Sequence, residues 1–193
     1  MASCHAAQYF EVGALSMEDE RVPVSTVIQF AGLGYLDPGS HTDDLEANSK
    51  IEVPLWLALL LQKKRIANLD TPKIFNKRSR DNLEAGAGSI NLREQSPHYF
   101  TVGIALSRIK QDDDLQKKLL AAFTKERFRN IMDLAFNSQN DDVSEQIRSF
   151  TDIEQNLFYA GFEQSVAFSN WKSGKQKRLR VSGAASIAKS NSK

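Results

Sequence analysis

The segment "PLWLALLLQKKR", Pro54 to Arg65, constrains the fold of this chain more than any other. Seven apolar residues follow the proline, and Gln62 and three basic side chains come next. A helix that spans a bilayer needs about 20 apolar residues, so the segment is too short for a membrane and is predicted to be a buried helix. Proline suits the first helical turn, and basic side chains suit the C-terminal end of the helix dipole.

The composition is that of a globular protein. With 193 residues, of which 41% are hydrophobic and 25% charged, the chain can form one sizeable core or a core plus a small accessory domain. The net charge of +1 does not favour wholesale binding to nucleic acid or anionic lipid, so any such activity has to be local. The single cysteine, Cys4, cannot form a disulfide framework, which indicates a reduced, intracellular protein. We expect no secretory signal.

Two patterns of hydrophobicity meet near Pro54. Before it, the apolar residues between Val22 and Phe30 alternate with smaller or polar ones, which is typical of a half-buried strand. Residues 40–50 are polar and loop-like, and 50–53 form a last short strand in this prediction. We therefore expect a small β-rich domain over residues 1–53, which leans on the rest of the chain or on a partner.

Helix signals dominate after Pro54. Thr71-Pro72 and Ser96-Pro97 each pair a capping hydroxyl residue with a proline at the first helical position. The predicted helices cover residues 54–67, 72–84, 97–109, 113–137 and 142–171. The predicted fold class is α+β and mainly α, with a helical domain over 54–174 of about five helices, the last two long. Residues 175–193 lack apolar periodicity and are predicted to be a flexible basic tail.

The last two predicted helices carry more apolar surface than one core face requires. On the fifth, the predicted core face contains Val143, Ile147, Phe150, Ile153, Leu157, Phe158, Phe168 and Trp171. Second apolar stripes lie elsewhere, at Phe128, Met132 and Phe136 on the fourth helix and at Tyr159, Phe162 and Val166 on the fifth. Since a surface helix needs only one apolar stripe, we expect these six residues to contact a partner. Arg127 and Arg129 flank Phe128 and are predicted to form an arginine-bearing rim of that interface.

A catalytic interpretation finds little support. The histidines His5, His41 and His98 are far apart and none has a His or Cys at metal-ligand spacing. No nucleotide-binding loop or nucleophile elbow occurs. The carboxylates from Asp112 to Asp114 are predicted to favour the start of a helix rather than to hold Mg²⁺. We expect no catalytic residue, no cofactor and no metal.

Basic clusters leave two interpretations open. Seven positive side chains lie within eighteen residues, at Lys63, Lys64, Arg65, Lys73, Lys77, Arg78 and Arg80. Such a patch can contact the phosphates of DNA. Otherwise these residues are the solvated faces of two short helices, or they meet acidic surfaces of a partner. The basic residues from Lys172 to Arg180 fit a nuclear-import signal, although short basic runs are weak predictors.

Several segments, in order along most of the chain, are similar to one known family. They are "YFEVGALSMEDERVPV", "GLGYLDPGSHTDDLEANSKIEVPLWLA", "LDTPKIF", "SPHYFTVG" and "KERFRNIMDLAFNSQND". The chain resembles the third partner-of-Sld-five (Psf) family of subunits of the eukaryotic GINS complex. One departure is Gly13-Ala14-Leu15-Ser16, where the family usually has an acidic pair followed by aliphatic residues.

The resemblance implies a β-rich B domain followed by a helical A domain. It implies a heterotetramer with three sister subunits, namely Sld five and the first and second Psf proteins. That tetramer joins the MCM hexamer and the Cdc forty-five protein in the replicative helicase of the nucleus, where the MCM subunits supply the ATPase. The expected function is therefore that of a non-catalytic scaffold. The alternative is a DNA-binding module that uses the basic patch from Lys63 to Arg80.

Overall fold

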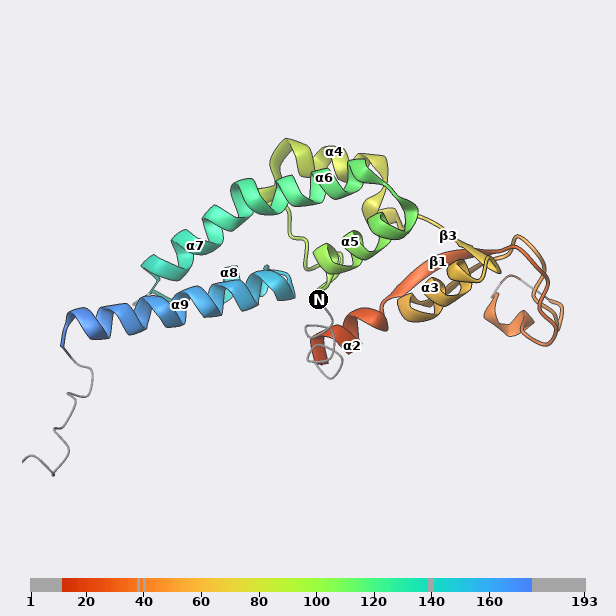
Figure 1. Ribbon diagram of the computed structural model, residues 1–193, viewed down its shortest axis with the longest axis horizontal. Helices are drawn as coiled ribbons and strands as arrows, with labels where there is room; N and C mark the ends of the chain where they lie inside the picture. Colours follow the sequence, from red (N-terminus) through yellow and green to blue (C-terminus); the bar gives the residue numbers. More distant parts are fainter. Residues whose placement is uncertain (1–11, 38, 40, 139–140, 175–193) are drawn as a thin grey trace, which may run out of the picture.

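The computed structural model describes residues 12–37, 39, 41–138 and 141–174. A small antiparallel sheet with its helices lies at one end of the molecule, and the helical part extends to the other end (Figure 1). This is the α+β, mainly helical fold class that the sequence predicts. The predicted tail, residues 175–193, lies outside the described residues.

The sheet has three strands, β1 (Arg21–Thr26), β2 (Lys50–Pro54) and β3 (Ala67–Leu69), in the order β2-β1-β3. Val22, Val24 and Thr26 are buried and alternate with more exposed residues, as the pattern predicts. The strand ends at Thr26 instead of continuing to residue 30, because the chain bends at residues 27 and 28, and Phe30 forms only an isolated bridge with Leu45.

The apolar segment that follows Pro54 forms α3 (Leu55–Lys63), which packs against the sheet with Leu55 and Ala58 fully buried. The helix is shorter than predicted, because the N–H groups of Arg65 and Ile66 turn back to the carbonyls of Gln62 and Leu61, both at 3.0 Å. The chain then forms β3, which pairs with β1.

β3 adds a third strand to the sheet, so the sheet unit also includes α3 and reaches Leu69. A three-residue strand is too short for hydrophobic alternation to reveal it. The described N-terminal helix, α2 (Val12–Glu18), packs against α3. The sheet unit also includes a 3₁₀ turn, η1 (Gly34–Leu36).

The helical part begins after Leu69. Its elements are η2 (Lys73–Phe75), α4 (Lys77–Gly86), η3 (Ala87–Ser89), α5 (Tyr99–Lys110), α6 (Asp113–Ala122), η4 (Phe123–Arg127), α7 (Phe128–Asn137), α8 (Ser144–Arg148) and α9 (Asp152–Lys172). α5 lies at the centre of the core, where the Tyr99 ring is 4.8 Å from that of Phe75. Gly103 permits close packing, because a Cβ there would lie 2.6 Å from Leu119 Cδ1.

The helix predicted over residues 113–137 is confirmed as a continuous run of α6, η4 and α7, and Figure 1 shows α7 extending the line of α6. η4 is a π-helical turn, which adds one residue to the helical repeat. Regular spacing after the buried Ala122 would place residue 126 inside, but the turn places Arg127 there instead, followed by Ile131 and Ala135.

One predicted helix start is wrong, and one predicted helix is interrupted. Pro72 precedes the 3₁₀ turn that buries Phe75, and α4 begins only at Lys77, where Asn76 Oδ1 accepts from the Ser79 N–H (2.8 Å). The helix predicted over 142–171 is interrupted after α8, and α9 begins with a capping box in which the Thr151 N–H donates to Glu154 Oε2 (2.9 Å). Among the described helices, none has the length and apolarity that a membrane span requires.

Candidate protein-interaction surface

Arg127 lies inside the protein, so the prediction that it forms an interface rim is wrong. Its side chain is 6% exposed and forms a bidentate ion pair with Glu154, through Nε to Oε1 and through Nη2 to Oε2 (2.9 Å). Its Nη1 donates to the carbonyls of Ala87 (2.7 Å) and Ile90 (2.8 Å). Every nitrogen of the guanidinium is thus used to join η4, the loop after α4 and the first turn of α9.

This ion pair places the start of α9 beside the start of α7, and the two helices run side by side in the same direction (Figure 1). Further along the pair, toward the C-terminal ends of both helices, the Ser165 hydroxyl donates to the Phe136 carbonyl (3.4 Å). Between these contacts, a Cβ on Gly161 would lie 3.1 Å from Ala135 Cβ. The contact face of α9 is therefore Glu154, Phe158, Gly161 and Ser165, which contains two small residues.

Large apolar side chains occupy the sides of this helix pair. Seen from the N-terminal ends of two parallel helices, the residues on one side of the pair lie clockwise of the contact face on one helix and anticlockwise of it on the other. On one side the stripe Phe128, Met132 and Phe136 of α7 therefore lies beside the flank of α9 that carries Leu157, Phe168 and Trp171. We call these six residues the aromatic face. Phe136 is 50% exposed and Trp171 63% exposed, while Met132 and Leu157 are partly buried.

α8 covers the opposite side of the pair. Gln155 Nε2 donates to the Ile147 carbonyl of α8 (2.9 Å), and the Phe162 ring stacks on that of Phe158 at 5.9 Å. Phe162 and Val166, predicted to contact a partner, are thus partly buried by this chain itself, whereas Tyr159 is exposed. The two stripes that the sequence predicts as one kind of surface lie on opposite sides of the pair.

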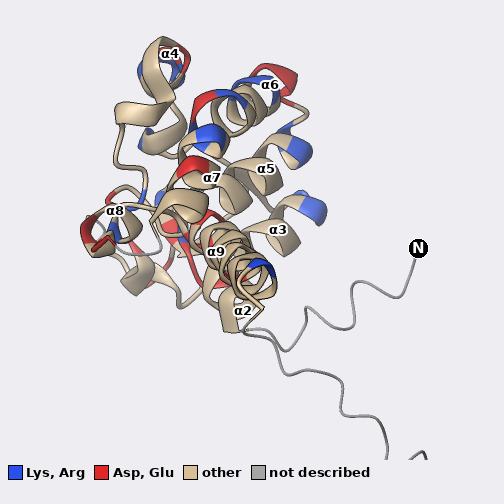
Figure 2. Ribbon diagram, turned by 90° about the vertical axis from the view of Figure 1, so that its left-hand side faces the viewer, with Lys and Arg blue, Asp and Glu red and all other residues tan. Residues whose placement is uncertain are grey.

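The predicted core face of α9 is wrong at Ile153, Phe168 and Trp171, which are exposed. The prediction assigned the largest apolar residues to the core face. The close contact with α7 is instead made by the small residues Gly161 and Ser165 and by Glu154, which is paired with Arg127. Arg129 is exposed on α7, and its contact with a partner stays a prediction. Figure 2 looks along α9 from its C-terminal end and shows a helix pair with few charged residues compared with α4 and α6.

The basic patch predicted between Lys63 and Arg80 is divided by the fold. Arg80 pairs with Asp112 (2.7 Å) and Asp114 (3.4 Å) and donates from Nε to the Phe75 carbonyl (2.9 Å). The hydrogen bond from Arg80 holds the pKa of Asp112 below its ordinary value. Asp112 also caps α6, as predicted, because its Oδ1 accepts from the Leu115 N–H (3.1 Å). Arg80 is therefore a structural residue.

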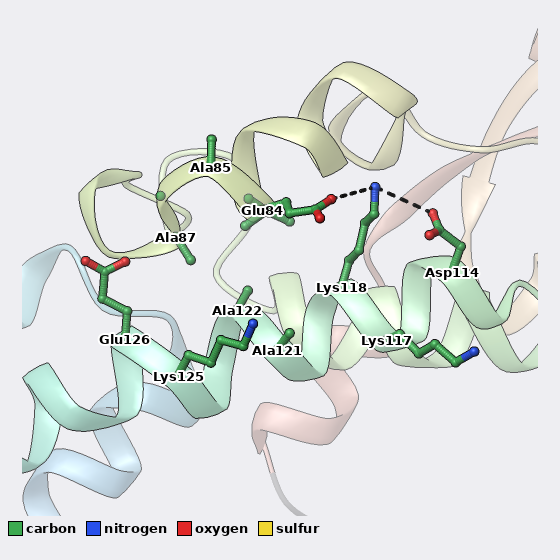
Figure 3. Close-up of a pocket in the computed structure, with 12 residues that line it drawn as sticks. Glu84, Ala85, Ala87, Asp114, Lys117, Lys118, Ala121, Ala122, Lys125 and Glu126 are labelled. Carbon is green, nitrogen blue, oxygen red and sulfur yellow. Dashed lines mark ion pairs between the residues drawn. The ribbon is translucent and has the colours of Figure 1, made fainter.

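A second set of ion pairs joins the same two helices. Lys118 of α6 contacts Glu84 (3.1 Å) and Asp81 (3.3 Å) of α4, and Asp114 of its own helix (3.9 Å). Figure 3 shows Lys118 between Glu84 and Asp114 in the lining of a groove to which Ala121 and Ala122 also belong. The carboxylates gathered on Lys118 make this region a poor site for phosphate.

The other basic side chains remain exposed. Lys73, Lys77 and Arg78 lie around the start of α4, while Lys63, Lys64 and Arg65 lie at the end of α3. Among the residues that the structure describes, none of these six forms an ion pair. They belong to two different parts of the fold, the end of α3 and the start of α4.

The structure brings together three polar residues that sequence reasoning did not connect. His98 Nε2 lies 3.0 Å from the Ser16 hydroxyl, and its Nδ1 lies 3.2 Å from Asp152, which Arg93 also binds (3.1 Å). The order Ser, His, carboxylate is that of a hydrolase triad. Ser16, however, lies in the middle of α2, where its own N–H belongs to the helix and cannot stabilise an oxyanion. The cluster joins α2 to α5 and α9, and we assign it a structural role.

The fold and the aromatic face define a class of protein: a small sheet unit and a helical bundle whose last helices expose an apolar side. Comparison with known proteins gives the family. Residues 10–63 match the family model described as PSF3 N-terminal domain, and residues 74–172 match the GINS complex protein helical bundle domain.

Two relatives give the extent of the similarity. The chain is 34% identical over 172 residues to the DNA replication complex GINS protein PSF3 of Xenopus laevis, covering 87% of this chain and 81% of the frog protein. It is 30% identical over 183 residues to the human protein of the same name, covering 90% of this chain and 84% of the human one. The chain belongs to the PSF3 family of GINS subunits, which confirms the resemblance.

Proposed function

We propose that this chain is a non-catalytic structural subunit of a GINS heterotetramer in the nucleus. Its sister subunits are Sld five and the first and second Psf proteins. The assembled tetramer joins the MCM hexamer and the Cdc forty-five protein in the replicative helicase, where it serves the initiation of DNA replication and the progress of the fork. The relatives named above, which are DNA replication complex GINS proteins, support this proposal.

The single observation that carries the proposal is the aromatic face of α7 and α9. Large side chains such as Phe136 and Trp171 are exposed on neighbouring helices with few charges between them. Each such side chain contributes about 1.5–3 kcal/mol when it is buried, so a helical partner that covers this face is strongly favoured. Aromatic residues are also the usual energetic centres of interfaces. Tyr159, on the α8 side, is proposed as a second contact.

Co-expression with the sister subunits tests the proposal. Trp171→Asp should prevent co-purification of the tetramer, and Phe136→Asp should do the same, while both variants stay folded because these side chains are exposed. Asn170→Asp is the matched control, because it adds the same charge one residue away on another side of α9. Tyr159→Asp measures the contribution of the α8 side. If both aromatic-face variants assembled as the unaltered chain does, the proposal would be wrong.

The rival function, DNA binding through the patch from Lys63 to Arg80, predicts a different response to salt. Binding to phosphates weakens steeply as salt rises, whereas an interface made mainly of apolar side chains persists. A tetramer that survives 0.5 M salt, on the order of three times the physiological ionic strength, together with no salt-sensitive binding of DNA by the chain, would favour the structural role.

A further inference from the structure

Helix α3 carries an exposed apolar stripe that lies far from the aromatic face. Trp56 is 44% exposed and Leu60 is 49% exposed, one turn apart on the same side of the helix. The opposite side, with Leu55 and Ala58, already supplies the contact with the sheet. Since a surface helix needs one apolar stripe for its own core, Trp56 and Leu60 are surplus to the packing of this chain.

The two ends of this stripe carry opposite charge. Lys63, Lys64 and Arg65 follow Leu60, are exposed and form no ion pair among the described residues. At the other end, the Leu55 N–H donates to the Glu20 carbonyl (2.8 Å), which brings the acidic run of residues 18–20 beside the first turn of α3. The Leu55 end of α3 therefore adjoins three acidic residues, followed by the single base Arg21, while the end beyond Leu60 is basic.

Arg65 occupies a backbone position that glycine normally fills. It follows α3 with φ of 58°, and its N–H and that of Ile66 close the helix on Gln62 and Leu61. A left-handed residue at this point of a helix end is usually glycine, because a Cβ is unfavourable there. The fold alone thus favours glycine, and the charged side chain that stands there instead is exposed to solvent.

We propose that the stripe of Trp56 and Leu60 docks an amphipathic helix of another protein, whose apolar side covers these two residues. Its acidic end lies over Lys63, Lys64 and Arg65, and its basic end lies beside residues 18–20. Single-stranded nucleic acid could also stack on a tryptophan next to basic residues. The acidic run beside the Trp56 end repels phosphates, so the charge pattern favours the protein helix.

Fluorescence anisotropy with the full-length chain tests this docking. The probe is a labelled synthetic helical peptide that has leucines four residues apart, glutamates at one end and lysines at the other. A second peptide of the same composition has its charges evenly mixed along its length, and a 20-nucleotide oligo-dT is the nucleic-acid probe. The end-charged peptide should bind at least tenfold more tightly than the mixed one, because only it matches the two ends of α3.

Variants separate docking from folding. Trp56→Ala and Leu60→Ala should each weaken the end-charged peptide at least tenfold. Arg65→Gly should weaken it severalfold while raising the Tm, because glycine relieves the left-handed residue. Lys77→Ala and Arg78→Ala, exposed basic residues on α4, are the matched controls and should change nothing.

Several outcomes would overturn the docking proposal. They are no binding of the end-charged peptide, equal binding of the mixed peptide, or unchanged affinity in Arg65→Gly. Trp56-dependent binding of oligo-dT with a steep salt dependence would identify nucleic acid as the occupant instead. None of these results bears on the assembly of the tetramer through α7 and α9, because the two surfaces lie on different units of the fold.

Discussion

At the scale of single residues, the buried ion pair of Arg127 and Glu154 connects most of the helical part. Glu154 accepts from Arg127 and from the Thr151 N–H, so both its oxygens are used. A buried pair is stabilising only while both partners are present, because a single remaining charge is left desolvated. The pair therefore specifies the arrangement of η4 and α9 rather than adding stability of its own.

The first prediction follows from this dependence. Arg127→Met should lower the free energy of unfolding by about 3–5 kcal/mol, because it leaves the Glu154 carboxylate buried without its partner. Urea denaturation of the full-length chain measures this loss. Arg129→Met is the matched control on an exposed arginine two residues away and should change stability by less than about 0.5 kcal/mol.

The partner variant completes a double-mutant cycle. Glu154→Gln should be destabilising by itself, and the double variant Arg127→Met with Glu154→Gln should lose less than the sum of the two single changes. Strict additivity would show that the two side chains do not act as a pair.

A second prediction concerns pH. The hydrogen bond from Arg80 lowers the pKa of Asp112 from its ordinary value of 3.8. A carboxylate whose pKa is lower in the folded state stabilises the fold above its unfolded pKa, and this contribution disappears as pH falls through the folded pKa. Stability should therefore decrease on acidification below about pH 4, and Asp112→Asn should remove part of that decrease.

Thermal unfolding between about pH 2.5 and 7 measures this slope. Asp113→Asn is the control, since Asp113 is an exposed carboxylate in the same turn of α6. An equal change of slope in both variants would mean that the pair with Arg80 does not cause the effect.

At the scale of elements, the sequence predicted helices correctly where the apolar period continues over many residues. It did not predict which residues face inward where one extra residue in a turn shifts the helical repeat. The run of 113–137 was predictable because its apolar positions recur over seven turns, and the π turn keeps it continuous. The inward position of Arg127 was not predictable from regular helical spacing, because the π turn moves the buried position from 126 to 127. The interruption at Thr151 did have a signal, since Thr151 and Glu154 form the sequence pattern of a capping box.

The contact face of α9 shows a second limit. Hydrophobic patterns assign the largest side chains to the core, whereas two closely packed helices select the smallest. Gly161 and Ser165 therefore face α7, and Phe168 and Trp171 remain for a partner. The sequence predicts that these helices carry more apolar surface than their core requires. It does not predict on which side of the helix pair this surface lies, because that depends on the parallel packing of α7 against α9.

A third prediction tests this contact. Gly161→Val should lower the free energy of unfolding by about 1–3 kcal/mol, because even a Cβ would lie 3.1 Å from that of Ala135 and must push the helices apart. Chemical denaturation measures the loss. Gly13→Val is the control, because a Cβ there meets nothing within 4 Å. A comparable loss in both variants would point to helix propensity rather than packing.

At the scale of the whole molecule, the two units are joined at more than one place. The chain passes from β3 to the helical part, and α2 is fastened to it through Ser16 and His98. The order of a β-rich unit followed by helices was predictable from the change of period near Pro54. The return of the chain to the sheet at β3 was not, because three residues cannot show a period. The long arm of α7 and α9 extends from the rest of the helical part, on the side away from the sheet (Figure 1).

The last prediction belongs to this arm. A partner that binds the folded chain raises its apparent stability by mass action, so the Tm should rise when sister subunits are added and should depend on their concentration. Phe136→Asp should leave the Tm of the chain alone nearly unchanged, because half of the Phe136 side chain is already exposed, yet it should abolish most of the rise. Differential scanning fluorimetry at several concentrations measures both quantities. If the rise survived in Phe136→Asp and vanished in Tyr159→Asp, the interface would lie on the α8 side of the helix pair rather than on the aromatic face.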